Sequence, residues 1–97
     1  MDEKDTIRRL EEDAKMYEVT KMTTFRGSDL QEAFKGYREN GAGEKVEITV
    51  EVLDAEDGAG THRFAVSAYS QDGKEAHGKE AATLEEAMPN VRWEDLD

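Results

Sequence analysis

The two histidines come first in a search for chemistry, because histidine is the usual general base and a common metal ligand. His62 lies just before an expected strand and follows Asp57, whereas His77 lies on the polar face of a later strand. A His–His–carboxylate metal site is one interpretation, but no His-x-x-x-His spacing supports it. We interpret both as surface histidines and expect neither a metal site nor a cofactor.

An acidic stretch from Asp54 to Gly58 looks like the start of a calcium-binding loop. In an EF-hand loop that begins at Asp54, Glu56 would supply the third ligand position. Gly58 and Ala65 would occupy the fifth and twelfth positions, where side-chain oxygen ligands are required. The pattern therefore fails, and we interpret the segment as a solvated loop.

The remaining groups that could do catalysis are not arranged for it. With 24 acidic residues in the chain, no carboxylate pair is singled out for acid–base chemistry. Ser28 and Ser70 have no histidine close by in the sequence. The segments 41–43 and 58–60 are rich in glycine but lack the lysine and the following helix of a phosphate-binding loop. We therefore expect a protein that is not an enzyme.

The composition describes a small domain without covalent cross-links. The 97 residues suit one domain, and the 36% of hydrophobic residues fall in periodic segments, which argues against general disorder. There are no cysteines, so disulfides and thiolate metal sites are excluded. The sequence has no apolar run of the roughly 20 residues that a membrane helix needs, and no signal-peptide pattern. We expect a cytoplasmic protein that does not bind membranes.

The acidic charge is large and unevenly distributed. The formal net charge is −11, which disfavours direct binding to phosphate and hence to nucleic acid. Residues 44–57 hold six acids against one base, and residues 80–97 again hold six acids against one base. Such clustering is more than solubility requires, and it indicates an acidic surface that a basic partner could recognise.

Periodicity predicts a helix over residues 3–14, a strand over 16–25 and a second helix over 28–40. The apolar stripe of the first helix is narrow, so this helix is either loosely attached or completed by a partner. Ser28 and Gln31 match a capping box at the start of the second helix, and Asn40-Gly41 match its end. Its expected buried stripe is Leu30, Ala33, Phe34 and Tyr37.

The second half of the chain predicts an antiparallel meander followed by a helix. Apolar residues alternate with Glu47, Thr49 and Glu51 over residues 46–52, which is typical of a half-buried strand. A strand follows at 64–68, and the turn at 71–73 allows two registers. We prefer a three-residue loop with Gly73 in the left-handed conformation, which pairs Ala68 with Ala76. Thr83 should cap the last helix, and Trp93 should dock on the core.

These elements predict an α+β fold in one domain spanning residues 1–97. The expected order is α-β-α-β-β-β-α, with an antiparallel sheet of three to four strands and helices packed on one face. The order of the last five elements is similar to that of a double-stranded-RNA-binding domain. The last helix, however, starts with acids where such a domain needs bases, so RNA binding is not expected.

The leading functional hypothesis is a protein-interaction domain whose acidic surface binds a basic, nucleic-acid-handling partner. A nucleic-acid mimic that acts as an inhibitor, such as a phage-encoded anti-CRISPR or anti-restriction protein, would have this character. The expected partner-binding residues are Glu44, Glu47, Glu51, Asp54, Glu56, Asp57, Glu85 and Glu86. The alternatives are a solvated acidic face, and a small-molecule-binding or enzymatic domain, dimeric through its sheet, with a pocket lined by Tyr17, Phe34, Tyr37 and Trp93.

Overall fold

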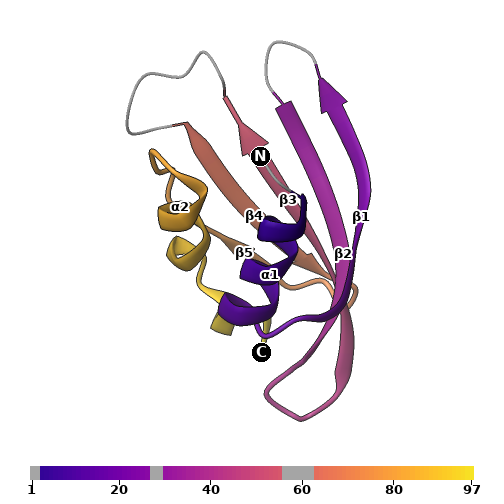
Figure 1. The fold of residues 1–97 in the computed structure, drawn as a ribbon. Coiled ribbons are helices and arrows are strands. Elements are labelled where there is room, and N and C mark those ends of the chain that lie inside the picture. Colours follow the sequence, from indigo (N-terminus) through magenta and orange to yellow (C-terminus); the bar gives the residue numbers. More distant parts are fainter. Residues whose placement is uncertain (1–2, 27–29, 56–62) are drawn as a thin grey trace.

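The computed structural model describes residues 3–26, 30–55 and 63–97, and it confirms the α+β class (Figure 1). Five antiparallel strands form one sheet in the order β1-β2-β3-β4-β5. Along the chain the elements are α1 (Glu3–Asp13), β1 (Tyr17–Arg26), β2 (Leu30–Glu39), β3 (Lys45–Asp54), β4 (Phe64–Ser70), β5 (Glu75–His77), α2 (Leu84–Asn90) and the 3₁₀ helix η2 (Trp93–Leu96).

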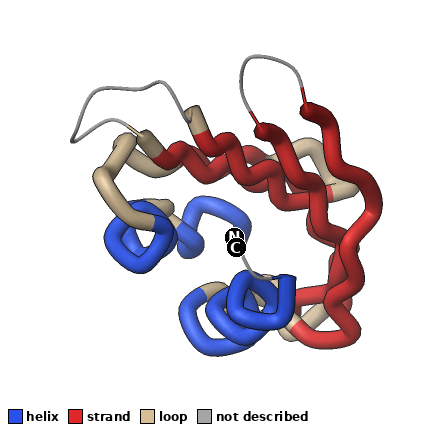
Figure 2. The backbone as a smooth tube through the Cα atoms, turned by 45° about the horizontal axis from the view of Figure 1, so that its top comes forward, coloured by secondary structure: helices blue, strands red, loops and turns tan. Residues whose placement is uncertain are grey.

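The fold has two layers, with the helices on one face of a curved sheet (Figure 2). The core lies between these layers, and alternation along β3 directs Val46, Ile48, Val50 and Val52 into it. From the helical side, Leu10 of α1 is fully buried against this face. No helix in the described part of the chain is long and apolar enough to cross a membrane.

The predicted helix over residues 28–40 is wrong, because residues 30–39 form strand β2. All ten residues of β2 pair with β3, from Leu30 opposite Asp54 to Glu39 opposite Lys45, and β2 also pairs with β1. Two ladders of backbone hydrogen bonds outweigh a weak helical preference that Gly36 lowers by about 1 kcal/mol. The capping residue Ser28 lies outside the described residues. The sheet therefore has five strands rather than three to four, and the expected likeness to an RNA-binding domain disappears.

Strand β1 is irregular where it crosses Gly36. Its pairing with β2 shifts register between Tyr17 and Thr20, and Glu18 adopts a left-handed φ of 54°. This bulge turns Val19 onto the core while Tyr17 stays on the outer side, so these two residues do not share a face as they would in a regular strand. A Cβ on Gly36 would lie 2.9 Å from Val19 Cγ2 and 3.1 Å from the Tyr17 carbonyl oxygen. Glycine at position 36 thus permits the close approach.

The hairpin between β4 and β5 has the predicted three-residue loop. Gly73 is left-handed, with φ of 91°, and Ala68 pairs with Ala76. The Gly78 amide donates to the Val66 carbonyl at 3.0 Å, as that register requires.

The C-terminal segment also folds as predicted. The Glu86 amide donates to Thr83 Oγ1 at 3.2 Å, which caps α2. Leu84, Ala87 and Met88 are buried, and Trp93 is only 7% exposed. The segment thereby completes the layer that covers the inner face of the sheet.

Candidate functional site

The predicted acidic residues on β3 do not all share one face. Glu47 and Glu51 lie on the outer face of the sheet, with Thr49 between them, whereas Asp54 faces inward. Asp54 is only 3% exposed and receives both Arg63 Nε, at 2.7 Å from Oδ1, and Arg63 Nη2, at 3.2 Å from Oδ2. This carboxylate holds the fold and does not contribute to an outer acidic surface.

The other predicted partner residues are spread over the molecule. Glu44 is exposed at the start of β3, and Glu85 and Glu86 are exposed on α2, on the opposite side of the sheet from Glu47 and Glu51. Glu85 forms an ion pair with Arg9 of α1, with Arg9 Nη2 at 3.4 Å from Glu85 Oε1. Glu56 and Asp57 lie outside the described residues. The described members of the set therefore do not form one continuous surface.

The outer side of the sheet is the more distinctive surface, because no described helix covers it (Figure 2). We call this surface the open face. Its residues are Tyr17, Lys35, Tyr37, Lys45, Glu47, Thr49, Glu51, Ser67, Tyr69, Glu75 and His77. All three tyrosines of the chain belong to it, and none of them is in the core.

Two of the tyrosines already hold a cation. The Tyr17 and Tyr37 rings have centroids 6.2 Å apart, and Lys45 Nζ lies 4.3 Å from the Tyr37 centroid and 5.7 Å from that of Tyr17. Lys45 also pairs with Glu18 at 3.4 Å. Aromatic faces attract ammonium and guanidinium groups through the negative charge density of the ring. This end of the open face is therefore built to receive positive charge.

The third tyrosine lies beside carboxylates. Tyr69 pairs with Thr49 on β3 and with Glu75 on β5, so Glu47 and Glu51 are its diagonal neighbours along β3. Glu47 is engaged by Lys35 at 3.1 Å. Glu51 and Glu75 have no ion pair with any described residue, which leaves two free acceptors around the Tyr69 ring.

A serine and a histidine also meet on the open face. Ser67 Oγ lies 3.0 Å from His77 Nδ1, the separation of a nucleophile and its base. The Tyr69 ring meets the His77 ring edge-on at a centroid distance of 5.7 Å, and no described carboxylate orients the imidazole. Both side chains are partly or fully exposed on a flat sheet. We interpret the pair as a cross-strand hydrogen bond, which the predicted hairpin register implies.

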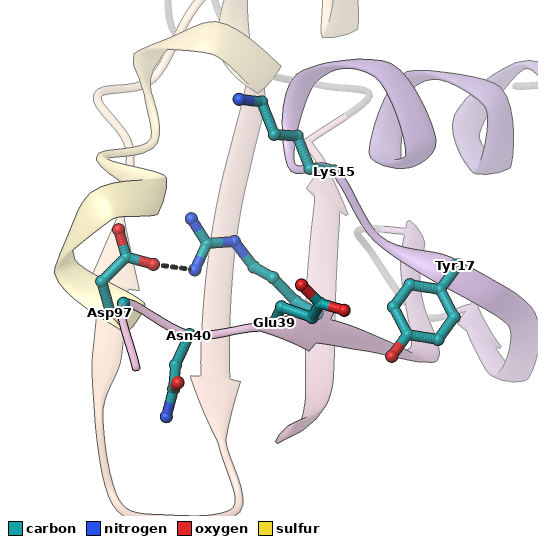
Figure 3. Close-up of a pocket in the computed structure, with 7 residues that line it drawn as sticks. Lys15, Tyr17, Glu39, Asn40 and Asp97 are labelled. Carbon is teal, nitrogen blue, oxygen red and sulfur yellow. Dashed lines mark hydrogen bonds and ion pairs between the residues drawn. The ribbon is translucent and has the colours of Figure 1, made fainter. Parts of the chain in front are cut away.

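A polar pocket of about 450 Å³ opens where the chain leaves α1 and β2 (Figure 3). It is lined by Lys15, Tyr17, Arg38, Glu39, Asn40, Gly41 and Asp97. Figure 3 shows Tyr17 and Asp97 at opposite sides of it. The structure does not assemble the predicted aromatic pocket, because Phe34 and Trp93 are core residues and Tyr37 lies on the open face.

The lining of this polar pocket was missed by sequence reasoning. Lys15, Arg38 and Asp97 are far apart in the sequence, and segment 28–40 was expected to be helical. Asn40-Gly41 was identified only as a helix end, although Asn40 Oδ1 in fact accepts the Ala42 and Glu44 amides, each at 2.9 Å. Only the strand assignment of β2 would have revealed that Arg38 points inward.

Two buried polar groups lack full hydrogen bonding among the described residues, the Trp93 Nε1 group and the Glu32 carboxylate. Glu32 on the inner face is 4% exposed, and its Oε1 receives Lys21 Nζ at 3.5 Å. Its Oε2 has no hydrogen-bond partner among the described residues. Within the described ranges no group of three or more histidine, aspartate or glutamate side chains is placed to hold a metal ion.

No protein-family model matches the sequence, and comparisons with curated proteins and with solved structures found no match either.

Proposed function

We propose that this chain is a non-enzymatic protein-interaction domain that binds a basic partner through its open face. The observation that carries the proposal is the position of the three tyrosines, all on the uncovered side of the sheet. Tyrosine is enriched in protein interfaces, where its large ring provides contact area and its hydroxyl remains able to hydrogen-bond. A ring in the core would serve stability alone.

The expected partner chemistry follows from charge. A net charge of −11 attracts basic proteins from solution and accelerates their association. At the open face, a partner's arginine or lysine can lie over the Tyr69 ring while it bonds to Glu51 or Glu75. Lys45 over Tyr37 provides the same type of contact within the chain. Basic nucleic-acid-handling proteins are the partner class we favour, and inhibition of such a protein is the role we propose.

The helical layer is the competing acidic surface. Residues 3–13 and 84–97 hold ten acids against four bases, whereas the open face holds three acids and two bases. If charge alone determined binding, the helical layer would dominate. The proposal instead requires the rings and carboxylates of the open face, and this difference can be tested.

The test compares two double variants with the same change in net charge, +4. Glu51→Lys with Glu75→Lys alters the open face without breaking a described ion pair. Glu86→Lys with Asp95→Lys alters the helical layer and serves as the matched control. Wild type and both variants are immobilised, exposed to lysate of the source organism, and washed with low and then high salt. Captured proteins are then purified and their affinities measured.

The expected result is a basic protein retained at low salt by wild type and by the helical-layer variant, but lost by the open-face variant. Tyr69→Ala should weaken the same complex at least tenfold, since tyrosine is enriched among the interface residues whose truncation costs about 2 kcal/mol or more. Equal loss from both double variants would show that only net charge matters. Retention by the open-face variant would reject the open face as the binding surface.

A further inference from the structure

We propose that the polar pocket beside β2 binds a small zwitterion, a molecule of amino-acid size that carries one carboxylate and one ammonium group. The site is distinct from the open face except for Tyr17, which borders both. It is therefore independent of the protein-binding role proposed above.

The pocket is rich in hydrogen-bond donors that lack partners. Arg38 Nε donates to the Ala14 carbonyl at 3.1 Å and Nη1 donates to Asp97, which leaves Nη2 without a described partner. The Lys15 ammonium has no partner among the described residues. Since the Asn40 oxygen is occupied by backbone amides, its NH₂ group remains free to donate. A carboxylate satisfies such donors best, because charge-assisted hydrogen bonds are the strongest.

The unpaired lysine is unusual in this chain. Acids outnumber bases by 24 to 13, and most described lysines and arginines form an ion pair. Lys15 and Lys79 are the two described lysines whose ammonium groups lack a recorded partner. Only Lys15 lines a pocket, so only its charge is available to a ligand held there.

The charges of the lining favour a zwitterion over a simple anion. Two bases, Lys15 and Arg38, are balanced by two acids, Glu39 and Asp97. Asp97 is engaged by Arg38, whereas Glu39 is exposed and has no described partner. Glu39 can accept from an ammonium group near Tyr17, on the other side of the pocket from Asp97 (Figure 3). A phosphate dianion would be repelled both by the Glu39 carboxylate and by the net charge of −11.

The Arg38 guanidinium is held in place by the fold before any ligand arrives. The Arg38 side chain is only 11% exposed and is held from both ends of its guanidinium. Lys15 and Glu18 hold left-handed φ values of 57° and 54°, which are uncommon for residues with a side chain. These two residues flank the segment that carries Tyr17 into the pocket lining. Preorganised donors reduce the entropy that binding must overcome.

The experiment is an NMR titration of the ¹⁵N-labelled full chain. The probes are each of the common amino acids and, in separate arms, acetate, methylamine and inorganic phosphate. At least one amino acid should cause saturable shifts of the Lys15, Tyr17 and Gly41 amides at millimolar concentration. Acetate and methylamine at the same concentration should not. Absence of saturation with every amino acid, or tighter binding of acetate or phosphate, would overturn the proposal.

Substitutions then locate the site. Lys15→Met removes the unpaired ammonium without breaking a described ion pair, and it should weaken binding about tenfold or more. Lys79→Met is the matched control and should leave the affinity unchanged. Glu39→Gln should weaken binding of the amino acid, because it removes the proposed acceptor of the ammonium group. Equal effects of Lys15→Met and Lys79→Met would show that the ligand binds elsewhere.

Discussion

The two faces of strands β2 and β3 share one backbone and differ in almost every other respect. On the inner face Phe34, Val50 and Val52 have no exposed surface, and burial of apolar area holds them together. On the open face Lys35 pairs with Glu47 and Lys45 lies over Tyr37, so the contacts are between individual charges and rings. Stability therefore depends mainly on the inner face, and the open face remains available for recognition.

The largest expected loss of stability comes from removing an aromatic side chain from the inner face. Phe34→Ala should lower the free energy of unfolding by about 3–5 kcal/mol, because a fully buried ring is lost and a cavity remains. Tyr37→Ala, on the open face of the same strand, should cost about 1 kcal/mol or less. Chemical denaturation of both variants measures the difference. Similar losses would contradict the division between the two faces.

A substitution at Gly36 tests whether the backbone of β1, which lies against β2 at this position, can shift. Gly36→Ala would place a Cβ 2.9 Å from Val19 Cγ2 and 3.1 Å from the Tyr17 carbonyl oxygen. Because one of these atoms belongs to the backbone, relief requires movement of β1, and we expect a loss of about 1–3 kcal/mol in thermal or chemical unfolding.

Gly41→Ala is the control for this substitution. Its Cβ would meet Asp97 Cβ at 3.4 Å, an ordinary contact, so stability should change by about 0.5 kcal/mol at most. An equally stable Gly36→Ala protein would mean that the bulge in β1 is soft.

Breaking an ion pair should also cost more stability on the inner face than on the open face. The difference should be smaller than the difference between the two ring substitutions. Arg63→Met leaves the buried Asp54 carboxylate without its two-point partner, and we expect a loss of about 1–2 kcal/mol. This value is kept below that of a fully buried pair because Arg63 itself is 45% exposed.

Lys35→Met breaks the open-face pair with Glu47, whose side chains are 40% and 33% exposed, and it should cost about 0.5 kcal/mol or less. Unfolding at low and at high salt distinguishes the two pairs, because only the exposed one is strongly screened. A larger loss from Lys35→Met than from Arg63→Met would reverse the comparison.

The sequence predicted the regions in which one signal dominates. Alternation from Val46 to Val52 identified β3, and the glycine at position 73 determined the hairpin register, which places Ser67 opposite His77. It failed at β2, where the spacing of Leu30, Ala33, Phe34 and Tyr37 fits a helical stripe, although in the strand Phe34 and Tyr37 lie on opposite faces. A local pattern cannot show that two neighbouring strands will pair with a segment over its whole length.

The candidate sites were predicted only in part, for the same reason. Glu47 and Glu51 were placed on the outer face, but the inward orientation of Asp54 depends on the length of β3. Tyr37 was expected in the core because the helix assignment put it beside Phe34. The pocket residues Lys15, Arg38 and Asp97 come from three distant segments, and no spacing along a chain records that they meet.

The smallest expected effect concerns the turn that leads from β4 to β5. Ser70 faces inward, and its hydroxyl donates to the Asp72 carboxylate. This hydrogen bond, helped by the charge and backbone amide of Lys74, lowers the pKa of Asp72 below its ordinary value. The stabilisation is present above that ordinary value, about 3.9, and is lost as the pH falls through the lowered pKa of the folded state.

Ser70→Ala should therefore move the Asp72 titration, followed by the NMR shift of its carboxyl carbon, to higher pH. Ser67→Ala removes a hydroxyl from the open face of the same strand and should leave that titration unchanged, because Ser67 bonds to His77 instead. A titration of Asp72 that is the same in both variants would show that Lys74, rather than the inward-facing serine, lowers its pKa. The expected difference between the two serine variants would extend the comparison of the two faces from packing to the titration of a single carboxyl group.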